Sequence, residues 1–495
     1  MKNLVIKIAI PALLLIVLPG CEKLLEIKSE SSITEQIYFK NEGDFEPNVT
    51  GIYTYLRGFA NNDLYGEQRS EELVNGPNSR LSSAVWGQNL STTNGTLDYG
   101  AWYTAIGHCN LLLEKIKDFD FASNPDTKKR IIAETLGLRA WFYFHLLRII
   151  GDTPLMLDAI TTDNVPLLPR SSAADVMKQI QADIDEALTQ LTSSGNFSKT
   201  AFPSTKYRFS YAALQAFKAD AKLWSAKVLG GGDADLNAAI TALTEVEASG
   251  VMLNADFKDV IGKRASAGNP EVILSAFFLR DENVSNYSIN TIAITSLIAD
   301  PKILNRDSIP SAISPSFAQG GYLMSPKSKA LFDNASDKRI PYTFITERFI
   351  TGYGNRSWVT KLPGTKYADD RFADNDVIIY RLADIYLMKA EAYAALNNTN
   401  DAVTYLNKVR SRAGISDYAG ATDKLSVEKV ILDERGRELY FENKRWYDLV
   451  RFHKAGTIDV YTYVPNLVGK TTPLFWPLAQ SVLAKNTNLQ QTAGY

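Results

Sequence analysis

Apolar residues recur at spacings of three and four through most of the first half of the chain, which is the period of a helix that buries one face. This period predicts helices over residues 102–116, 131–150, 171–191, 211–229 and 235–249. The third helix has the clearest signal, because an apolar stripe follows the capping residues Ser171-Ser172. The stripe consists of Val176, Ile180, Ile184, Leu188 and Leu191. Residues 46–250 are therefore predicted to form an N-terminal helical region.

The helical period fades after residue 250. Gly, Pro, Asn, Ser and Asp become frequent between residues 251 and 376, and short apolar runs such as Val272–Leu279 have the length of a strand. Long segments without regular structure are usually functional or disordered, and the aromatic residues of this one argue against disorder. We predict a loop-rich, ligand-binding region at 251–376 and a second helical region at 377–495, with helices resuming at Val377.

Residues 381–414 carry the clearest internal pattern. The spacing of large and small residues there is typical of a tetratricopeptide repeat, a pair of antiparallel helices, although an arbitrary helical hairpin would share it. One pair cannot bury its own apolar face, so the helices before residue 250 are candidates to stack on it. The predicted fold class is mainly α, with stacked tetratricopeptide-like helix pairs and a loop-rich part that carries short strands. The residues of the pattern are Tyr386, Ala390, Tyr393, Ala402 and Leu406.

The N-terminus has the features of an export signal. An apolar run of 11 residues, Ile8–Leu18, is too short to span a bilayer as a helix. It ends in Leu18-Pro19-Gly20-Cys21, which is similar to a bacterial lipobox, whose cysteine is acylated after cleavage. We predict a signal peptide at 1–20 and a tether at 21–45 that is lipidated on Cys21, so that several acyl chains anchor the protein to a membrane. An ordinary secretory signal beside an incidental cysteine is the alternative.

Charge and composition remove several classes of function. The formal net charge is −2, from 53 basic and 55 acidic residues, and this balance lacks the basic footprint of a nucleic-acid-binding protein. The three histidines, His108, His145 and His453, are scattered and match no metal-binding motif, so no metal or other cofactor is predicted. Cys109 lies in a helical, apolar context and is predicted to be a small buried side chain rather than a nucleophile.

A series of motifs is informative through its order and spacing. The motifs are Cys109-Asn110, Glu114-Lys115-Ile116, Arg139-Ala140, Tyr143-Phe144, Gly151-Asp152-Thr153-Pro154-Leu155, Arg381-Leu382-Ala383-Asp384, Lys389-Ala390-Glu391-Ala392, Arg412-Ala413-Gly414, Glu434-Arg435 and Arg445-Trp446-Tyr447-Asp448-Leu449. Together they resemble the SusD/RagB family over nearly the whole chain. The resemblance implies a lipid-anchored protein of the outer membrane, on the cell surface, that binds an oligo- or polysaccharide. It also implies delivery of this glycan to a SusC-like TonB-dependent transporter.

The family resemblance also implies how the glycan is bound. Aromatic rings stack on the C–H faces of sugar rings, and polar groups pair with the hydroxyls. The acid, arginine, tryptophan and asparagine expected from an early loop correspond to Glu72, Arg80, Trp86 and Asn89.

A second contribution to the site is expected from residues 280–360. The candidates there are Tyr322, Tyr353 and Trp358, and Trp358 follows a turn that looks exposed. The tryptophans that lie on helical stripes, in contrast, are predicted to belong to the core; they are Trp141, Trp224 and Trp446.

Two other functions fit parts of the sequence. A RagB-like relative would bind a peptide or protein, as stacked helical repeats often do. A glycoside hydrolase would need two opposed carboxylates. The pairs Asp369-Asp370 and Glu71-Glu72 have no distinctive context, and Glu438 and Glu442 could form a further pair. Arg435 and Arg445 lie three or four positions from these acids, so ion pairs that keep both carboxylates charged are the better interpretation. We therefore predict a binding protein rather than an enzyme.

The same interpretation is given to a second charged pair, Arg381 and Asp384, which are three positions apart near the start of the second helical region. These residues are predicted to stabilise the fold and to take no part in chemistry.

Overall fold

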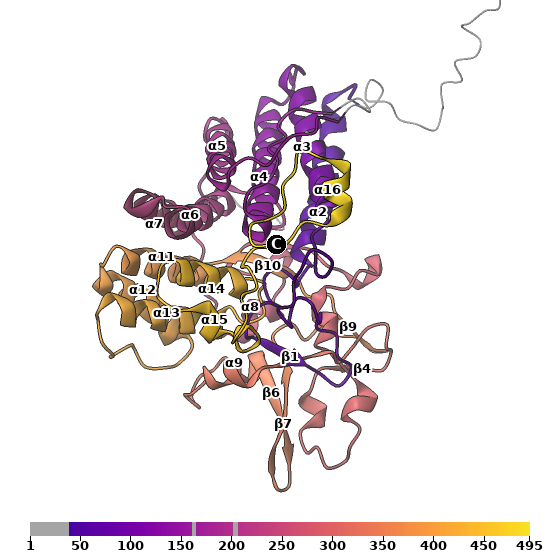
Figure 1. Ribbon diagram of the computed structural model, residues 1–495, viewed down its shortest axis with the longest axis vertical. Helices are drawn as coiled ribbons and strands as arrows, with labels where there is room; N and C mark the ends of the chain where they lie inside the picture. Colours follow the sequence, from indigo (N-terminus) through magenta and orange to yellow (C-terminus); the bar gives the residue numbers. More distant parts are fainter. Residues whose placement is uncertain (1–38, 161–164, 201–205) are drawn as a thin grey trace, which may run out of the picture.

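The computed structural model describes residues 39–160, 165–200 and 206–495, and helices are its main elements (Figure 1). The predicted signal peptide and Cys21 lie outside the described residues. The N-terminal helices are α2 (Phe45–Ala60), α3 (Gly100–Lys117), α4 (Pro125–Ile150), α5 (Ala173–Thr192), α6 (Tyr211–Val228) and α7 (Gly232–Glu247). The C-terminal helices are α11 (Leu382–Ala395), α12 (Thr399–Arg412), α13 (Lys424–Glu438), α14 (Arg445–Lys454), α15 (Val460–Tyr463) and α16 (Gln480–Lys485).

Local sequence signals set the ends of these helices. The Ser172 hydroxyl accepts a hydrogen bond from the backbone N–H of Asp175 (3.1 Å) and so caps α5. Helix α4 ends at Gly151, whose φ of 73° favours glycine. The apolar stripe predicted for α5 faces inward, and Val176, Ile180 and Ile184 are fully buried.

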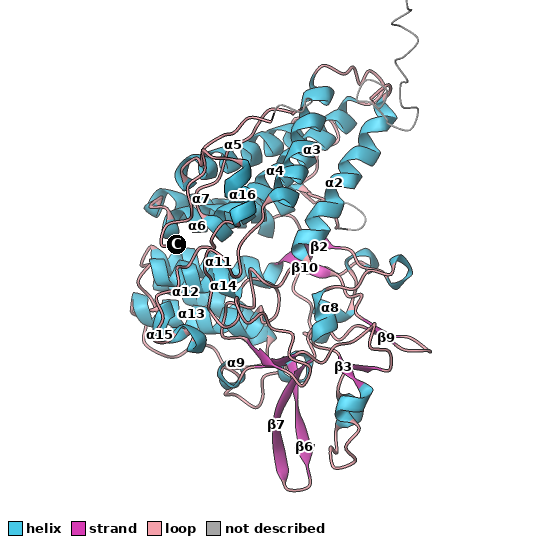
Figure 2. Cartoon of the chain, turned by 45° about the vertical axis from the view of Figure 1, so that its right-hand side comes forward, coloured by secondary structure: helices cyan, strands magenta, loops and turns pink. Residues whose placement is uncertain are grey.

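The helices pack in sequential order. Helix α4 contacts α3 and α5, α6 contacts α5 and α7, and α11 contacts α7, α12 and α13. At the α11–α12 contact, the small side chains of Ala390 and Ala402 are buried together with Leu406, as the repeat spacing predicts. The predicted mainly helical fold is confirmed, and Figure 2 shows the long helices above the β6–β7 hairpin.

Residues between the two helical groups form short strands and loops. The strands are β1 (Leu73–Asn75), β2 (Val272–Ala276), β3 (Ala293–Ile294), β4 (Ser311–Ala312), β5 (Tyr322–Met324), β6 (Phe344–Phe349), β7 (Gly352–Val359), β8 (Thr365–Lys366), β9 (Arg371–Phe372) and β10 (Val377–Arg381). They pair as β1–β5, β2–β10, β3–β4, β6–β7 and β8–β9. Three short helices lie among them: α8 (Lys258–Gly262), α9 (Pro326–Ala330) and α10 (Ile340–Thr343).

One boundary was predicted wrongly. Residues 377–381 form β10 instead of the start of a helix, because β2 supplies an antiparallel partner for this β-branched and aromatic run. The helix α11 begins only at Leu382.

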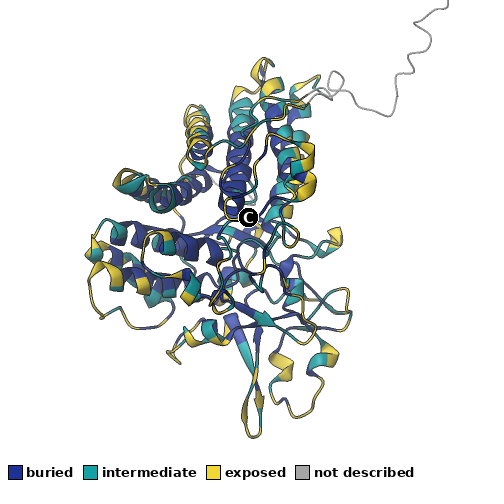
Figure 3. Ribbon diagram, viewed as in Figure 1, coloured by how far each residue is buried: buried dark blue, intermediate teal, exposed yellow. Residues whose placement is uncertain are grey.

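A single large apolar core joins both groups of helices. It extends in sequence from Phe45 on α2 to Leu478 near the C-terminus, and Figure 3 shows the buried faces of the helices turned toward one another. Trp141, Trp224 and Trp446 belong to it, as predicted. Cys109 is also fully buried, and burial raises the pKa of its thiol far above the ordinary value, which suits an inert side chain.

A layer of buried ion pairs surrounds Arg381, which is completely buried. Its guanidinium nitrogens lie 2.6 Å from a carboxylate oxygen of Glu438 and 2.7 Å from one of Glu442, and Glu271 is 2.8 Å away. Burial alone would raise the pKa of Glu438, but Arg412 and Arg381 outweigh it and hold this pKa below its ordinary value. Glu438 and Glu442 are thus ion-paired and charged, as predicted.

The partners within this layer differ from those predicted. Arg445 pairs with Glu71 (2.7 Å) and Arg435 with Asp384 (3.0 Å), so Arg381 and Asp384 do not pair with each other. A spacing of three or four positions brings side chains together only within one continuous helix. The chain instead turns between α13 and α14, where Phe441 has a φ of 57°, so the helical spacing is interrupted.

Candidate functional site

The short sheet of β1 and β5 positions two loops from distant parts of the sequence. Leu73 pairs with Met324 and Asn75 with Tyr322 in antiparallel register. Beyond β1 the chain continues along the end of β5, and the N–H of Gly76 donates to the carbonyl of Gly321 (2.7 Å). The approach is so close that a Cβ on Gly76 would lie 2.5 Å from the carbonyl oxygen of Gly320, so the turn requires glycine.

A polar group of side chains lies on this turn. The Arg80 guanidinium donates to the Oε1 of Gln319 (2.7 Å), and the Asn78 amide donates to the Gln319 carbonyl oxygen (2.6 Å). Asn78 and Arg80 are exposed. We call Asn78, Arg80 and Gln319 the amide shelf; its amides and guanidinium present hydrogen-bonding groups of the kind that recognise sugar hydroxyls.

The β6–β7 hairpin projects from the same scaffold, away from the helices (Figures 1 and 2). At its base Trp358 is fully buried and packs with Leu323 of β5, while its indole N–H donates to Glu347 Oε1 (2.9 Å). At its tip Ile350 is 86% exposed and Tyr353 is 75% exposed. Because the base is packed and hydrogen-bonded, the tip is a supported apolar projection and can serve as a contact site.

Trp86 is hydrogen-bonded to β1. Its indole N–H donates to the Leu73 carbonyl (2.9 Å), and its ring packs against the main core while remaining partly exposed. Three residues further on, the exposed amide of Asn89 accepts a hydrogen bond from the Lys470 ammonium (2.9 Å). Asn89 and Lys470 line an open hollow of about 610 Å³, formed by residues 88–92, 469–473 and 494–495.

Comparison with known proteins identifies the family. A family model described as "SusD family" matches residues 334–495, and one described as "Starch-binding associating with outer membrane" matches residues 23–219. The SusD-like protein P38 of Formosa agariphila is 28% identical, with 97% of this chain and 96% of that protein covered. The chain belongs to the SusD family.

Solved structures of the SusD superfamily have the same fold. A SusD superfamily protein of Bacteroides fragilis superposes with a TM-score of 0.80 at 26% identity, covering 92% of this chain and all of that one. The protein NanU of B. fragilis superposes with a TM-score of 0.79 at 27% identity, covering 95% of this chain and all of NanU. The helical framework and the loop-rich part described above are therefore shared with other SusD-family structures.

The site residues predicted for this SusD-family chain fall into two groups. Arg80, Asn89 and Tyr353 are exposed and Trp86 is partly exposed, so all four side chains can reach a ligand. The others are Glu72, Tyr322 and Trp358, which are buried and have no access to a ligand in this structure.

The predicted exposure of Trp358 is wrong for a definite reason. The turn Gly352-Tyr353-Gly354-Asn355 is exposed, but it belongs to the outer part of β7, and the strand carries Trp358 back into the base of the hairpin. Glu72 and Tyr322 flank the β1–β5 pairing and face inward. Tyr322 accepts a hydrogen bond from the Gln68 amide (2.7 Å), and Glu72 accepts one from the backbone N–H of Phe441 (3.0 Å). Both buried side chains stabilise the β1–β5 sheet that positions the site.

Several exposed or partly exposed residues of the surface are not among the predicted ones. Asn78 and Gln319 are 241 positions apart, so no local pattern brings them together. The pair Gly320-Gly321 was the one available signal, because adjacent glycines often mark a close approach of two backbones. Ile350 lay beside a predicted residue, and Lys470 lay in a C-terminal loop that carried no recognisable motif.

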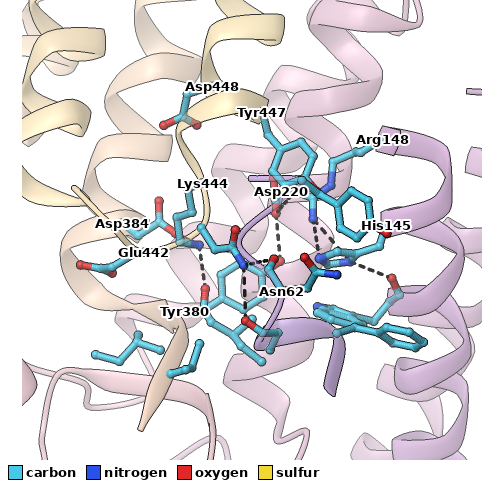
Figure 4. A pocket seen from close by; sticks show the side chains of 18 of the residues that line it. Asn62, His145, Arg148, Asp220, Tyr380, Asp384, Glu442, Lys444, Tyr447 and Asp448 are labelled. Carbon is cyan, nitrogen blue, oxygen red and sulfur yellow. Dashed lines mark hydrogen bonds and ion pairs between the residues drawn. The ribbon is translucent and has the colours of Figure 1, made fainter. Parts of the chain in front are cut away.

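A second cavity lies between the N-terminal and C-terminal helices (Figure 4). Its volume is about 60 Å³, enough for a few water molecules and far below the size of a small-molecule site. Polar side chains line it, among them His145, Arg148, Asp220 and Tyr447. Burial, followed by the charge of Arg148, lowers the pKa of His145 well below its ordinary value, so the imidazole is neutral. We assign the cavity to internal hydration of the fold.

In the described part of the chain no group of three or more His, Cys, Asp or Glu side chains is arranged to hold a metal ion. Within the ranges 39–160, 165–200 and 206–495, none of the helices has the length and apolar character needed to cross a membrane.

Proposed function

We propose that the protein is a cell-surface lipoprotein of the outer membrane that captures an oligo- or polysaccharide and passes it to a SusC-like TonB-dependent transporter. The observation that carries the proposal is the match of residues 23–219 to a family described as starch-binding and associated with the outer membrane. The amide shelf and the hairpin tip support it, because they combine hydrogen-bonding groups with an exposed aromatic ring, Tyr353.

Binding and delivery need no catalytic group. The carboxylates considered for hydrolysis, Glu438 and Glu442, are buried, paired with arginine and charged, whereas a general acid would need a raised pKa. On this proposal the protein holds the glycan through many weak contacts, and the transporter carries out the transport.

A glycan array tests the binding function directly. The purified protein is expected to bind a limited set of oligosaccharides and to release them unchanged. Shortening of a bound glycan would instead indicate a hydrolase. Binding of peptides from a parallel peptide array, with no glycan bound, would favour the RagB-like alternative and exclude the glycan proposal.

The partnership has its own test. The helices of the N-terminal half form a broad, rigid surface, and we propose that they dock on the transporter. Mild detergent extraction of the native membrane should co-purify a SusC-like barrel with the protein. If the barrel is present in the extract and consistently fails to co-purify, the proposed partnership is wrong, whatever the glycan array shows.

A further inference from the structure

Several arginines of the loop-rich region are neutralised by a carboxylate. Arg280 lies 2.7 Å from an oxygen of Asp369, and Arg356 lies 2.7 Å from one of Glu347. Arg264 contacts Asp374 at 3.2 Å and Asp376 at 3.3 Å. These ion pairs neutralise the charge of the three arginines.

The cations of the candidate site are different. Arg80 donates to the neutral amide oxygen of Gln319, and Lys470 donates to the amide oxygen of Asn89 and to the Gly87 carbonyl. Among the described residues, no carboxylate oxygen lies within 4.0 Å of the charged nitrogens of Arg80 or Lys470. Both side chains therefore retain a positive charge that the protein does not neutralise.

A further cation, Arg348, lies on the β6–β7 hairpin. Arg348 stands directly opposite Tyr353 in the β6–β7 register, so the two side chains lie on the same face of the hairpin. Arg348 is exposed, and in the described part of the chain it too has no carboxylate within 4.0 Å. Each cation thus accompanies one of the exposed site candidates: the amide shelf, Tyr353 or Asn89.

Packing and hydrogen bonds hold two of these cations, Arg80 and Lys470, in place. Arg80 packs against Gly321, so closely that a Cβ on this glycine would lie 2.3 Å from the Arg80 Cγ. Lys470 is held at the hollow beside Asn89, and it also binds the carbonyl of Gly87, the residue after Trp86. Cations that are already positioned lose less conformational entropy when they bind an anion.

We propose that the glycan bound at this surface is anionic, with carboxylate or sulfate groups on its sugar rings that pair with Arg80, Lys470 and Arg348. The inference rests on the proposed glycan-binding function and names its ligand class. Asn78, Gln319 and Asn89 then bind hydroxyl groups, Tyr353 stacks on a sugar ring, and the three cations bind the anions.

Matched oligosaccharides test the ligand class. One backbone is titrated in its neutral, uronate-bearing and sulfated forms into the full-length protein. The anionic forms should bind at least tenfold more tightly than the neutral form, since a hydrogen bond to a charged group contributes about this much. Their affinity should fall as sodium chloride is raised, because exposed charges are screened. Comparison of the uronate with the sulfate identifies which anion is preferred.

Variants locate the charge that is responsible. Arg80→Gln should weaken binding of the anionic glycan about tenfold and weaken that of the neutral one far less, because glutamine can still donate a hydrogen bond to a hydroxyl. Arg80→Lys should retain most of the affinity, since it keeps the charge. Lys178→Gln is the control, because it removes an equally exposed charge from α5, in the N-terminal helical region.

Two outcomes separate this inference from the function on which it rests. If neutral and anionic forms bind equally, without salt dependence and without loss in Arg80→Gln, the glycan-binding function stands and the anionic ligand class is wrong. If no glycan of either kind binds to the folded protein, the proposed function fails and the inference fails with it.

Discussion

Two buried carboxyl groups beneath the candidate site should make the stability of the protein depend on pH. Glu72, the residue before β1, interacts electrostatically with Glu67, and both side chains are almost completely buried. Backbone N–H groups of Phe441 and Asn443 donate to these carboxyl groups from the turn between α13 and α14. These two hydrogen bonds connect the segment before β1 to the turn between the C-terminal helices α13 and α14.

Burial sets the direction of the effect. Loss of solvent raises the pKa of Glu72 from its ordinary value of 4.5 to about 7, and it raises the pKa of Glu67 further still. The folded protein consequently keeps a proton that the unfolded chain releases above pH 4.5. The free energy of unfolding should fall as pH rises from 4.5 to about 7, because the unfolded chain binds fewer protons there. The difference between these pKa values corresponds to about 3 kcal/mol.

Glu72→Gln removes the titrating group and keeps a neutral side chain that can donate to Glu67 and accept from Phe441. Urea unfolding of both proteins at about pH 5 and about pH 8 measures the effect. Between these two pH values, the free energy of unfolding of the original protein should fall by about 3 kcal/mol more than that of the variant.

A neighbouring acid provides the matched control. Glu71 is also buried, but it pairs with Arg445 at 2.7 Å, so Glu71→Gln should destabilise the protein at both pH values. The loss should be roughly 3–5 kcal/mol, because the buried arginine would be left without its partner. Equal pH dependence in the original protein and in Glu72→Gln would show that Glu72 does not hold its proton in the folded state, and the argument would be refuted.

Three further predictions concern single side chains. Trp86→Ala should cost roughly 2 kcal/mol of glycan affinity in a titration, and unchanged affinity would remove Trp86 from the site. The same variant should lose about 2 kcal/mol of unfolding free energy in urea, because the partly buried indole also donates to the Leu73 carbonyl. Trp358→Ala should lower the free energy of unfolding by about 3–5 kcal/mol, since the indole fills the base of the hairpin, and a variant as stable as the original would contradict that packing. Cys21→Ser should release the protein from the membrane fraction or stop its processing, and an unchanged outer-membrane fraction with unchanged mobility would exclude the lipid anchor.

The helical framework could be predicted because its signals are local. The stripe on α5 and its cap at Ser172 lie within one segment, and the pattern at Ala390 and Ala402 lies within one helix pair. Each such segment buries a face that its own spacing reveals, so the sequence needs no knowledge of distant partners.

The site depends on contacts that no local pattern contains. Tyr322 is buried because β5 pairs with a strand about 250 positions earlier, and Trp358 is buried because its hairpin packs on β5. The amide shelf likewise exists only where the turn after β1 meets Gln319. Sequence reasoning found side chains of the right chemistry near these contacts, but it could not tell which of them face solvent.

Titration of a glycan into the original protein and into Tyr353→Ala tests the central claim most directly. Tyr353 is 75% exposed, so its removal should leave the fold intact while it removes a stacking surface. Tyr393→Ala, on helix α11, is the control for loss of a partly exposed tyrosine outside the site. The account predicts that a glycan selected on the array binds the original protein and the control alike, and binds Tyr353→Ala roughly tenfold or more weakly. Equal affinity for all three proteins would place the binding surface elsewhere on the molecule and contradict the account.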